Sequence, residues 1–310
     1  MTPILSEEVL DTQESGGPLV ALESTIISHG FPWPDNLDLA LALEAAVRAH
    51  GATPATIAVI DGVPRVGLGR DDLERLARAD RVEKCSARDL PFVCATGRTG
   101  ATTVAATCLL ADRAGIPVFA TGGIGGVHRG ATLTMDVSAD LAEIARARVA
   151  VVSAGAKSIL DLALTLEALE TLGVPIVGFG CDELPAFYTP HSGLPIPHRV
   201  DDLDTLARIV AAHRSLGLHG GLLIFNPIPP AHALPADRVD AWIAQALEAA
   251  QARQIEGKAL TPFLLAELAR LSNGATLPAN RALALHNADL AARLALRIAA
   301  LDVPALDGHS

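Results

Sequence analysis

Apolar and polar positions along this chain fall into blocks whose lengths and periods change in a regular order. Short apolar runs typical of buried strands occupy residues 116–123 (IPVFATGG), 148–156 (RVAVVSAGA) and 174–180 (VPIVGFG). Segments with helical periodicity lie between them, at 136–147 and 158–173. Because strand and helix alternate from about residue 88 to residue 226, the sequence predicts an α/β protein with a central, largely parallel sheet covered by helices on both faces, an α/β/α sandwich.

The flanking segments add a small hairpin and a helical C-terminal part to this prediction. Residues 17–25 form a further short strand run, and residues 35–51 have the pattern of an amphipathic helix closed by a glycine. Two strand-like runs in 55–68 meet at an Asp-Gly pair, which is a strong hairpin signal. We also expect a helix over 99–115. No linker or internal repeat divides the chain, so residues 1–310 are expected to form a single domain.

Composition narrows the class of protein. Half of the residues are apolar but only 3% are aromatic, so the core must be built from aliphatic side chains, which suits helices on a parallel sheet. The formal net charge of −11 argues against a nucleic-acid or anionic-membrane partner. No signal-like start, run of 18 uncharged apolar residues or C-x-x-C pair is present. We therefore expect a cytoplasmic protein with four reduced cysteines.

The polar positions that follow the predicted strands indicate where a ligand binds, because ligands of open α/β sheets bind at the carboxyl ends of the strands. Residues 23–29 follow the first strand, and a glycine-rich stretch at 121–131 follows a later one. The segments AGAKS (154–158) and FNPIP (225–229) end two others. We expect these segments to converge on one rim of the sheet.

Lys157 is the most informative of these residues. The chain uses 21 arginines and three lysines, yet one lysine is kept in the apolar run VVSAGAKSIL (151–160). Wherever only positive charge is needed, arginine would serve, but only a lysine amine can lose its proton in a desolvating pocket and attack a carbonyl carbon. The alternative is a structural lysine whose amine extends to solvent from a strand end.

Other candidate residues keep two interpretations each. The run TGGIGGVHRG (121–130) fails the dinucleotide-binding fingerprint, so it is either an anion-binding loop next to His128 or a tight loop that needs positive φ. Asp136 and Asp140, on either side of Ser138, either cap a helix or hold a hard divalent cation. Glu23 at a strand end is either a desolvated general acid or a solvated carboxylate. Asn280 and Asn287 share a helix face and either bind a base edge or support packing.

Six segments together resemble the pseudouridine-5'-phosphate glycosidase family, which includes indigoidine synthase A-like proteins. They occur in the family's order from about residue 18 to residue 300: ALESTIISHGFPWPDN, TGATTVAAT, FATGGIGGVHRGA, TMDVSADL, VVSAGAKSILDLALTLEALETLGVPIVGFG and GKALTPFLL. The resemblance implies an enzyme that reversibly splits the carbon-carbon glycosidic bond of pseudouridine 5'-phosphate into uracil and ribose 5-phosphate. It also implies a divalent metal, most often Mn²⁺, and a homotrimer.

The resemblance also implies a role for individual residues. Lys157 matches the family's covalent lysine and Glu23 its proton donor, whereas Asp136 matches a metal ligand. The positions that match substrate-binding residues are Lys84, Thr103, Val104, His128, Ser138, Ala139, Asp140 and Asn280. Among these, Thr103 and Asn280 match positions that contact uracil. Trp33 departs from the family pattern, and so does the segment LPANRALALHNA (277–288), which is more arginine-rich than that pattern; these departures leave base selectivity open.

The chemistry explains why such an enzyme needs a lysine. The bond to be broken joins ribose C1' to uracil C5, so the leaving carbon must gain a proton and the cation left at C1' must be stabilised. A lysine nitrogen bonded to C1' can do this as an iminium, which arginine cannot. Two alternatives remain: a Schiff-base aldolase or lyase acting on another sugar phosphate, and a non-catalytic phosphosugar-binding protein.

Overall fold

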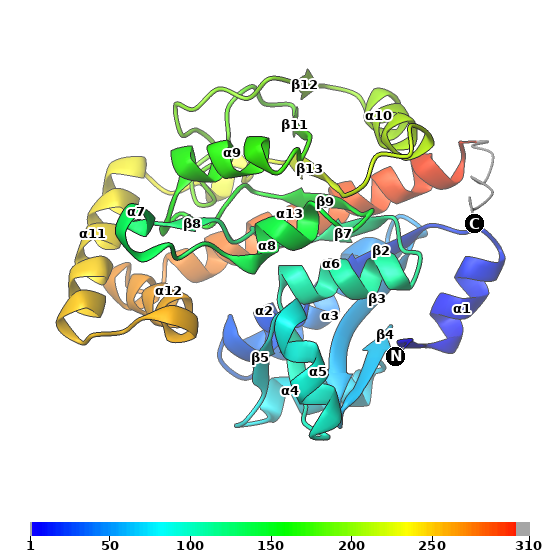
Figure 1. Cartoon of the computed structure of the whole chain (residues 1–310), viewed down its shortest axis with the longest axis horizontal. Helices are drawn as coiled ribbons and strands as arrows, with labels where there is room; N and C mark the ends of the chain where they lie inside the picture. Colours follow the sequence, from blue (N-terminus) through cyan, green and yellow to red (C-terminus); the bar gives the residue numbers. More distant parts are fainter. Residues whose placement is uncertain (1, 302–310) are drawn as a thin grey trace.

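The computed structural model describes residues 2–301, apart from the side chain of Lys258. An 11-stranded sheet runs through the molecule in the order β1-β4-β3-β2-β7-β9-β13-β11-β12, with β6 and β5 attached beside β3 (Figure 1). Strands β8 and β10 form a separate two-stranded antiparallel sheet. The strands of the two sheets are β1 (Ile4–Leu5), β2 (Leu19–Leu22), β3 (Thr53–Ile60), β4 (Val63–Val66), β5 (Glu83–Cys85), β6 (Gly100–Thr102), β7 (Val118–Ala120), β8 (Val127–His128), β9 (Ala150–Ser153), β10 (Leu160–Asp161), β11 (Ile176–Phe179), β12 (Arg199–Val200) and β13 (Leu222–Phe225).

Parallel pairing dominates the middle of this sheet, as the strand and helix alternation predicts. Strands β3, β2, β7, β9, β13 and β11 pair in parallel in that order. All four residues of β2, β9 and β13 are buried, because helices cover both faces. The carboxyl ends of β2, β7 and β9 therefore meet at one edge of the sheet.

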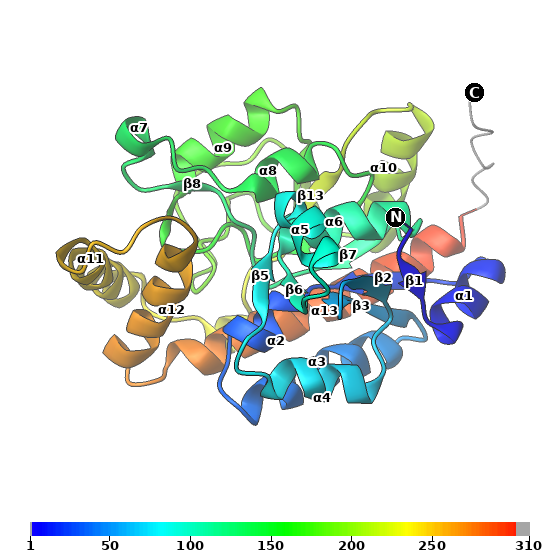
Figure 2. The ribbon, with the colours of Figure 1, turned by 60° about the horizontal axis from the view of Figure 1, so that its bottom comes forward.

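Helices cover the sheet on both sides, which confirms the predicted architecture. They are α1 (Glu7–Glu14), α2 (Thr25–His29), α3 (Asp35–Arg48), α4 (Arg70–Arg78), α5 (Leu90–Ala95), α6 (Val104–Arg113), α7 (Ala131–Thr134), α8 (Ala139–Ile144), α9 (Leu162–Thr171), α10 (Leu203–Ser215), α11 (Ala236–Ala252), α12 (Leu260–Leu271) and α13 (Thr276–Ala299). Helices α6 and α8 pack together on one face, and α3 packs with α13 on the other (Figure 1). Helices α11 and α12 pack against each other at one end of the molecule (Figure 2).

The predicted hairpin is formed by β3 and β4, which pair antiparallel. Its turn residues, Asp61 and Gly62, both have positive φ, at 49° and 80°. Asn, Asp and Gly accommodate this conformation best, which is why the Asp-Gly pair marks the turn in the sequence.

The predicted helix over 99–115 is wrong in its first part. Residues Gly100–Thr102 form β6, which pairs with β3 and β5, and the helix begins only at Val104. The segment TGATT has no periodicity of its own that separates strand from helix, so the partners on either side decide its conformation.

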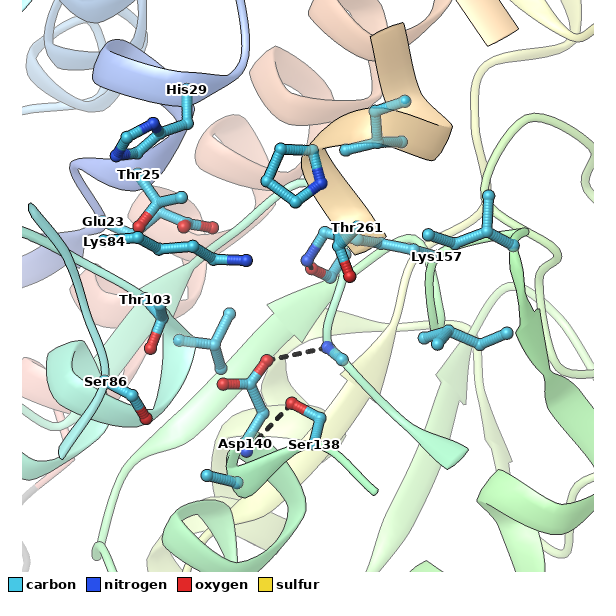
Figure 3. Close-up of a pocket in the computed structure, with 18 of the residues that line it drawn as sticks. Glu23, Thr25, His29, Lys84, Ser86, Thr103, Ser138, Asp140, Lys157 and Thr261 are labelled. Atoms are coloured by element: carbon cyan, nitrogen blue, oxygen red, sulfur yellow. Dashed lines mark hydrogen bonds between the residues drawn. The ribbon is translucent and has the colours of Figure 1, made fainter. Parts of the chain in front are cut away.

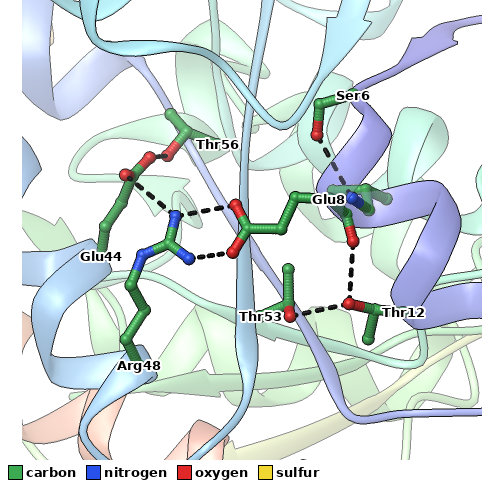
Figure 4. A network of polar contacts seen from close by, with 8 residues as sticks. Ser6, Glu8, Thr12, Glu44, Arg48, Thr53 and Thr56 are labelled. Carbon is green, nitrogen blue, oxygen red and sulfur yellow. Dashed lines mark hydrogen bonds and ion pairs between the residues drawn. The ribbon is translucent and has the colours of Figure 1, made fainter.

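The N-terminal segment is fixed to the sheet by polar contacts that the strand and helix pattern does not reveal. Arg48 of α3 forms a two-pronged ion pair with Glu8 of α1 and also approaches Glu44 (Figure 4). Glu44 in turn accepts a hydrogen bond of 2.7 Å from the Thr56 hydroxyl on β3. Helix α1, helix α3 and strand β3 are thus held together. No helix within residues 2–301 is both long and apolar enough to span a membrane.

Candidate active site

One cavity, of about 290 Å³, lies at the carboxyl ends of β2, β7 and β9 and is closed on its other side by α2, β5, α12 and the segment around residue 136. Every site residue predicted from the sequence lines this cavity. They are Glu23, Lys84, Thr103, Val104, His128, Asp136, Ser138, Ala139, Asp140, Lys157 and Asn280. They come from segments up to 257 residues apart in the chain, so the fold brings them together.

Lys157 follows β9, and its side chain reaches into the cavity from a partly buried position. The amine donates a hydrogen bond of 2.8 Å to the carbonyl oxygen of Gly123. Its backbone N–H donates to the carbonyl of Ile124, 3.0 Å away. Lys157 is therefore anchored at two points to the segment that follows β7, and its amine is not a solvent-directed strand-end group.

Glu23 follows β2 directly and lines the same cavity. The Thr121 hydroxyl donates a hydrogen bond of 2.5 Å to its Oε1 atom. Burial raises the pKa of the Glu23 carboxyl above its ordinary value, and this effect outweighs the attraction to Lys157 and the hydrogen bond from Thr121, which both lower the pKa. The carboxyl accordingly holds its proton to a higher pH than an exposed glutamate does.

Lys84 enters the cavity from β5, at the far side from Lys157 (Figure 3). Glu23 and Lys84 lie next to each other in this view, with Thr103 below them. Lys84 also affects its surroundings electrostatically: burial, and secondly the charge of Lys84, lower the pKa of His29. Lys84 thus places a positive charge in this part of the cavity, although the whole chain is acidic.

Thr103 and Val104 stand at the start of α6, with Thr103 as the N-cap residue. The Thr103 hydroxyl is buried and has no hydrogen-bond partner within the described part of the chain. A buried hydroxyl that lines a cavity and has no protein partner is suited to bond a ligand.

Asp140 connects the two sides of the site. One of its oxygens accepts a hydrogen bond from Ala105 N–H of α6 at 2.9 Å, and the other accepts from Gly125 N–H at 2.8 Å. Ser138 caps α8, its hydroxyl accepting from the backbone N–H of Asp140 (Figure 3). Of the two interpretations of this segment, the helix cap is present, and the cap residue is Ser138. Asp140 holds the start of α6 against the glycine-rich segment.

Several backbone N–H groups of the glycine-rich segment form hydrogen bonds within the protein. Those of Ile124, Gly125, Val127 and His128 donate to protein acceptors. Close approach to neighbouring side chains also requires two of its glycines. An added Cβ at Gly125 would lie 2.2 Å from the Ser138 hydroxyl oxygen, and one at Gly126 would lie 2.4 Å from that of Thr165. Of the glycines in this segment, only Gly130 has positive φ.

Asp136 is the residue that the sequence assigns to a divalent cation. Its Oδ2 lies 4.0 Å from Nδ1 of His128, and its side chain is 36% exposed. Within residues 2–301, no group of three or more His, Cys, Asp or Glu side chains is arranged to hold a metal ion. Ions such as Mg²⁺ and Mn²⁺ accept one or two carboxylates and complete their coordination with water. Asp136 therefore fits such an ion as a single protein ligand, with water or substrate oxygens as the others.

The two asparagines of α13 have different surroundings. Asn280 lines the cavity, whereas Asn287 is fully buried. Asn287 donates hydrogen bonds to the carbonyls of Thr121 and Gly122 and accepts one from Asn226. Asn287 thus fixes the carboxyl end of β7. The segment FNPIP, expected on the cavity rim, supports Asn287 through Asn226 and does not line the cavity.

Several cavity residues were not assigned from the sequence. They include Thr25, Ser86, Arg88, Phe187, Thr261 and Leu265. Thr261 and Leu265 belong to α12, within the family segment GKALTPFLL, which is the signal that could have indicated them. Phe187 lies inside the proline-rich segment 185–197 and carries no such signal. His29 also lines the cavity, and its buried Nε2 atom has no hydrogen-bond partner within the described residues.

Comparisons with known proteins identify the family to which this chain belongs. Residues 8–297 match the family model of indigoidine synthase A like protein. A pseudouridine-5'-phosphate glycosidase of Rhodospirillum centenum is 58% identical over 294 residues, covering 95% of this chain and 92% of that relative. One of a Nocardioides species is 54% identical over 297 residues, covering 96% and 97%.

Two crystal structures share the fold over nearly the whole chain. The prealnumycin C-glycosynthase AlnA in complex with ribulose 5-phosphate superposes with a TM-score of 0.89 at 41% identity, covering 97% of this chain and 98% of that one. An indigoidine synthase A-like protein from Thermotoga maritima gives 0.87 at 36% identity, covering 96% and 97%.

Proposed function

Because this chain belongs to the indigoidine synthase A-like family of pseudouridine-5'-phosphate glycosidases, we propose that it cleaves pseudouridine 5'-phosphate reversibly into uracil and ribose 5-phosphate. The observation that carries the proposal is the meeting of Lys157 and Glu23 in one cavity, with Lys84 beside Glu23. A reactive amine, a carboxyl with a raised pKa and a cation for phosphate are the groups that this reaction requires.

In the proposed mechanism, Lys84 binds the phosphate and so places the ribose between Glu23 and Lys157. The Lys157 nitrogen bonds to C1' as the ring oxygen leaves C1' and takes a proton supplied through Glu23. The bonded nitrogen then gives up a proton to the Glu23 carboxylate, which restores its lone pair. The electrons of the C1'–C5 bond pass to uracil C5, which takes this proton from Glu23, while the nitrogen lone pair forms the C=N bond of an iminium. Water adds to this carbon and releases ribose 5-phosphate, which restores the Lys157 amine.

The remaining cavity residues position the two halves of the substrate. The unpartnered Thr103 hydroxyl and the Asn280 amide are proposed to bind uracil. The others, Val104, His128, Ser138, Ala139 and Asp140, are proposed to line the sugar-phosphate side. The match to AlnA, whose structure contains ribulose 5-phosphate, supports a phosphosugar in this cavity.

A divalent cation, which we propose to be Mn²⁺, would be held by Asp136 and would supply positive charge next to the phosphosugar. We expect chelation to lower kcat/KM and Asp136→Asn to weaken Mn²⁺ binding at least tenfold. Paramagnetic resonance of free Mn²⁺ measures that binding independently of activity. Mn²⁺ binding that is equal in Asp136→Asn and the unaltered protein would remove Asp136 as the ligand.

The proposed function is tested by trapping the covalent intermediate. With ribose 5-phosphate and borohydride, the mass of the intact protein should increase by one reduced sugar phosphate attached at Lys157. Lys157→Arg keeps a positive charge but cannot form the imine, so it should lose both the adduct and uracil release. Measurable turnover by Lys157→Arg would contradict the mechanism.

The aldolase and the phosphosugar-binding alternatives give different results in the same experiment. An aldolase would form the adduct without releasing uracil from pseudouridine 5'-phosphate. A binding protein would retain ribose 5-phosphate but form no adduct.

We further propose that the enzyme is cytoplasmic and forms a homotrimer, as the family resemblance implies.

A further inference from the structure

Phe187 has a backbone conformation that its residue type rarely adopts. Its φ is 65°, in the left-handed region, and its side chain is buried. The backbone N–H of Phe187 donates a hydrogen bond of 3.1 Å to the carbonyl of Ala154, in the segment that leads to Lys157. A bulky residue kept in this conformation must be held by its surroundings, and such residues gather at functional sites.

The Phe187 ring lies directly against the backbone of Gly123. A Cβ atom added to Gly123 would be 2.5 Å from ring atoms Cδ2 and Cε2, so no other residue fits there without movement. The same loop approaches the next segment equally closely: a Cβ at Gly155 would be 2.0 Å from the carbonyl oxygen of Pro185. The loop around Phe187 is therefore in close contact with the segment that carries Lys157 and with the segment whose carbonyl accepts from the Lys157 amine.

Gly123 is the residue whose carbonyl accepts the hydrogen bond from the Lys157 amine. The peptide groups on either side of it are also fixed, since Ala154 N–H donates to Gly122 and Ile124 N–H donates to Gly155. Phe187 lines the cavity, and its ring packs against Gly123. A ring in this place both limits the movement of the Gly123 carbonyl and reduces the water around the amine.

We propose that Phe187 is a positioning residue for Lys157: its ring, packed on Gly123, holds the carbonyl that directs the amine into the cavity. This proposal rests on the function proposed above. Phe187 is not expected to touch the reacting bond. Its effect should appear in the rate of covalent bond formation, because a displacement of about 1 Å at a reacting group costs on the order of 10²-fold in rate.

The test compares Phe187→Leu with Phe187→Tyr in the full-length protein. Leucine removes the flat ring from Gly123, so we expect kcat and the rate of borohydride trapping with ribose 5-phosphate to fall by about 10- to 100-fold. KM for pseudouridine 5'-phosphate should change by less than about threefold, since the phosphate and uracil contacts remain. Tyrosine keeps the ring and should restore both rates.

Gly123→Ala provides a second variant that places a methyl group against the same ring. If the ring and Gly123 act as one unit, the loss from Gly123→Ala should be smaller in the Phe187→Leu background than alone, since the two changes disturb one contact. Strictly multiplicative losses would contradict the proposal.

Tyr188→Phe is the matched control. Tyr188 is the buried neighbour whose ring meets that of Phe187 edge-on at 4.8 Å, and it lies outside the cavity lining. The Tyr188→Phe variant should have a lower melting temperature than the unaltered protein but the same trapping rate. If Phe187→Leu loses stability but is trapped at the unaltered rate, Phe187 only fills the core and the inference fails. If the unaltered protein itself is not trapped at Lys157, the proposed function fails instead.

Discussion

Lys157 and Glu23 reach the same cavity from different strands, and each side chain is held by a hydrogen bond to a neighbouring residue. The amine of Lys157 is directed by the Gly123 carbonyl, and the carboxyl of Glu23 by the Thr121 hydroxyl. Both partners belong to the segment that follows β7, between the two strands in the sheet. The proposed acid and the proposed nucleophile are therefore both held by the segment that follows β7.

The raised pKa of Glu23 gives a prediction about pH. Protonated Glu23 is the form that donates, so kcat/KM should fall as pH rises through the Glu23 pKa, which burial has moved above its ordinary value. We expect Glu23→Gln to lower kcat by about 10²- to 10⁴-fold and to abolish this limb of the profile. The measurement is kcat/KM for pseudouridine 5'-phosphate against pH.

Glu44→Gln is the control for this experiment. Burial also raises the pKa of Glu44, but this residue lies outside the cavity lining, so its variant should keep the limb. A limb that persists in Glu23→Gln would assign the titration to another group.

At the scale of elements, α1, α3 and β3 depend on the polar network around Glu44 and Arg48 (Figure 4). Glu44 is buried and accepts from Thr56, while the Arg48 and Glu8 side chains are nearly half exposed. Exposed ion pairs contribute about 0–1 kcal/mol, so Arg48→Ala should lower the free energy of unfolding by no more than about 1 kcal/mol.

The effect of Glu44 on stability should depend on pH. Its folded-state pKa is raised, so its stabilising contribution is complete below the unfolded pKa of about 4.3 and is lost as pH rises through the folded pKa. Glu44→Gln can still accept from Thr56 and does not titrate. We therefore expect the difference in free energy of unfolding, Glu44→Gln minus the unaltered protein, to increase as the pH is raised from about 4 to about 8; urea titrations measure this difference. A difference that is constant with pH would contradict this.

The neighbouring strands explain why residues 100–102 form β6 and not the predicted helix. Residues 99–103 lie beside β3 and β5, and pairing with these strands sets their conformation. This affects the site, because Thr103 becomes the N-cap residue of a helix that starts at the cavity rather than a residue inside a helix.

At the scale of the whole molecule, exposed apolar side chains gather beside the cavity. Leu133 is 91% exposed and Met135 81%, and both belong to the segment that carries Asp136. Because such residues are costly to expose together, we propose that this segment contacts a second copy of the chain in the trimer that the family resemblance implies.

Substitution by lysine tests this interface. Leu133→Lys should shift the mass measured by light scattering after gel filtration from trimer towards monomer, since it places a charge in an apolar contact. Leu216→Lys is the matched control, because Leu216 is also exposed, at 72%, but follows α10. A monomeric unaltered protein, or a Leu133→Lys variant that remains a trimer, would contradict the proposal.

The sequence by itself determined the fold class, the parallel sheet, the hairpin at Asp61-Gly62 and the convergence of three segments on one edge of the sheet: the one with Glu23, the glycine-rich one and the one with Lys157. It could do so because strand and helix periodicity are local properties, and because parallel strands bring their carboxyl ends to one edge. The roles of these residues come from the family resemblance and remain predictions to be tested by the experiments above.

Only the tertiary structure decided what depends on close approach between distant segments. It separated Asn280, which faces the cavity, from Asn287, which supports β7, although both share one helix face. It showed why Gly123, Gly125 and Gly126 are glycines: they lie in close contact with Phe187, Ser138 and Thr165, respectively. It also placed Phe187 against Gly123. These outcomes depend on which side chain occupies a given volume, and that is settled only when the segments have packed together.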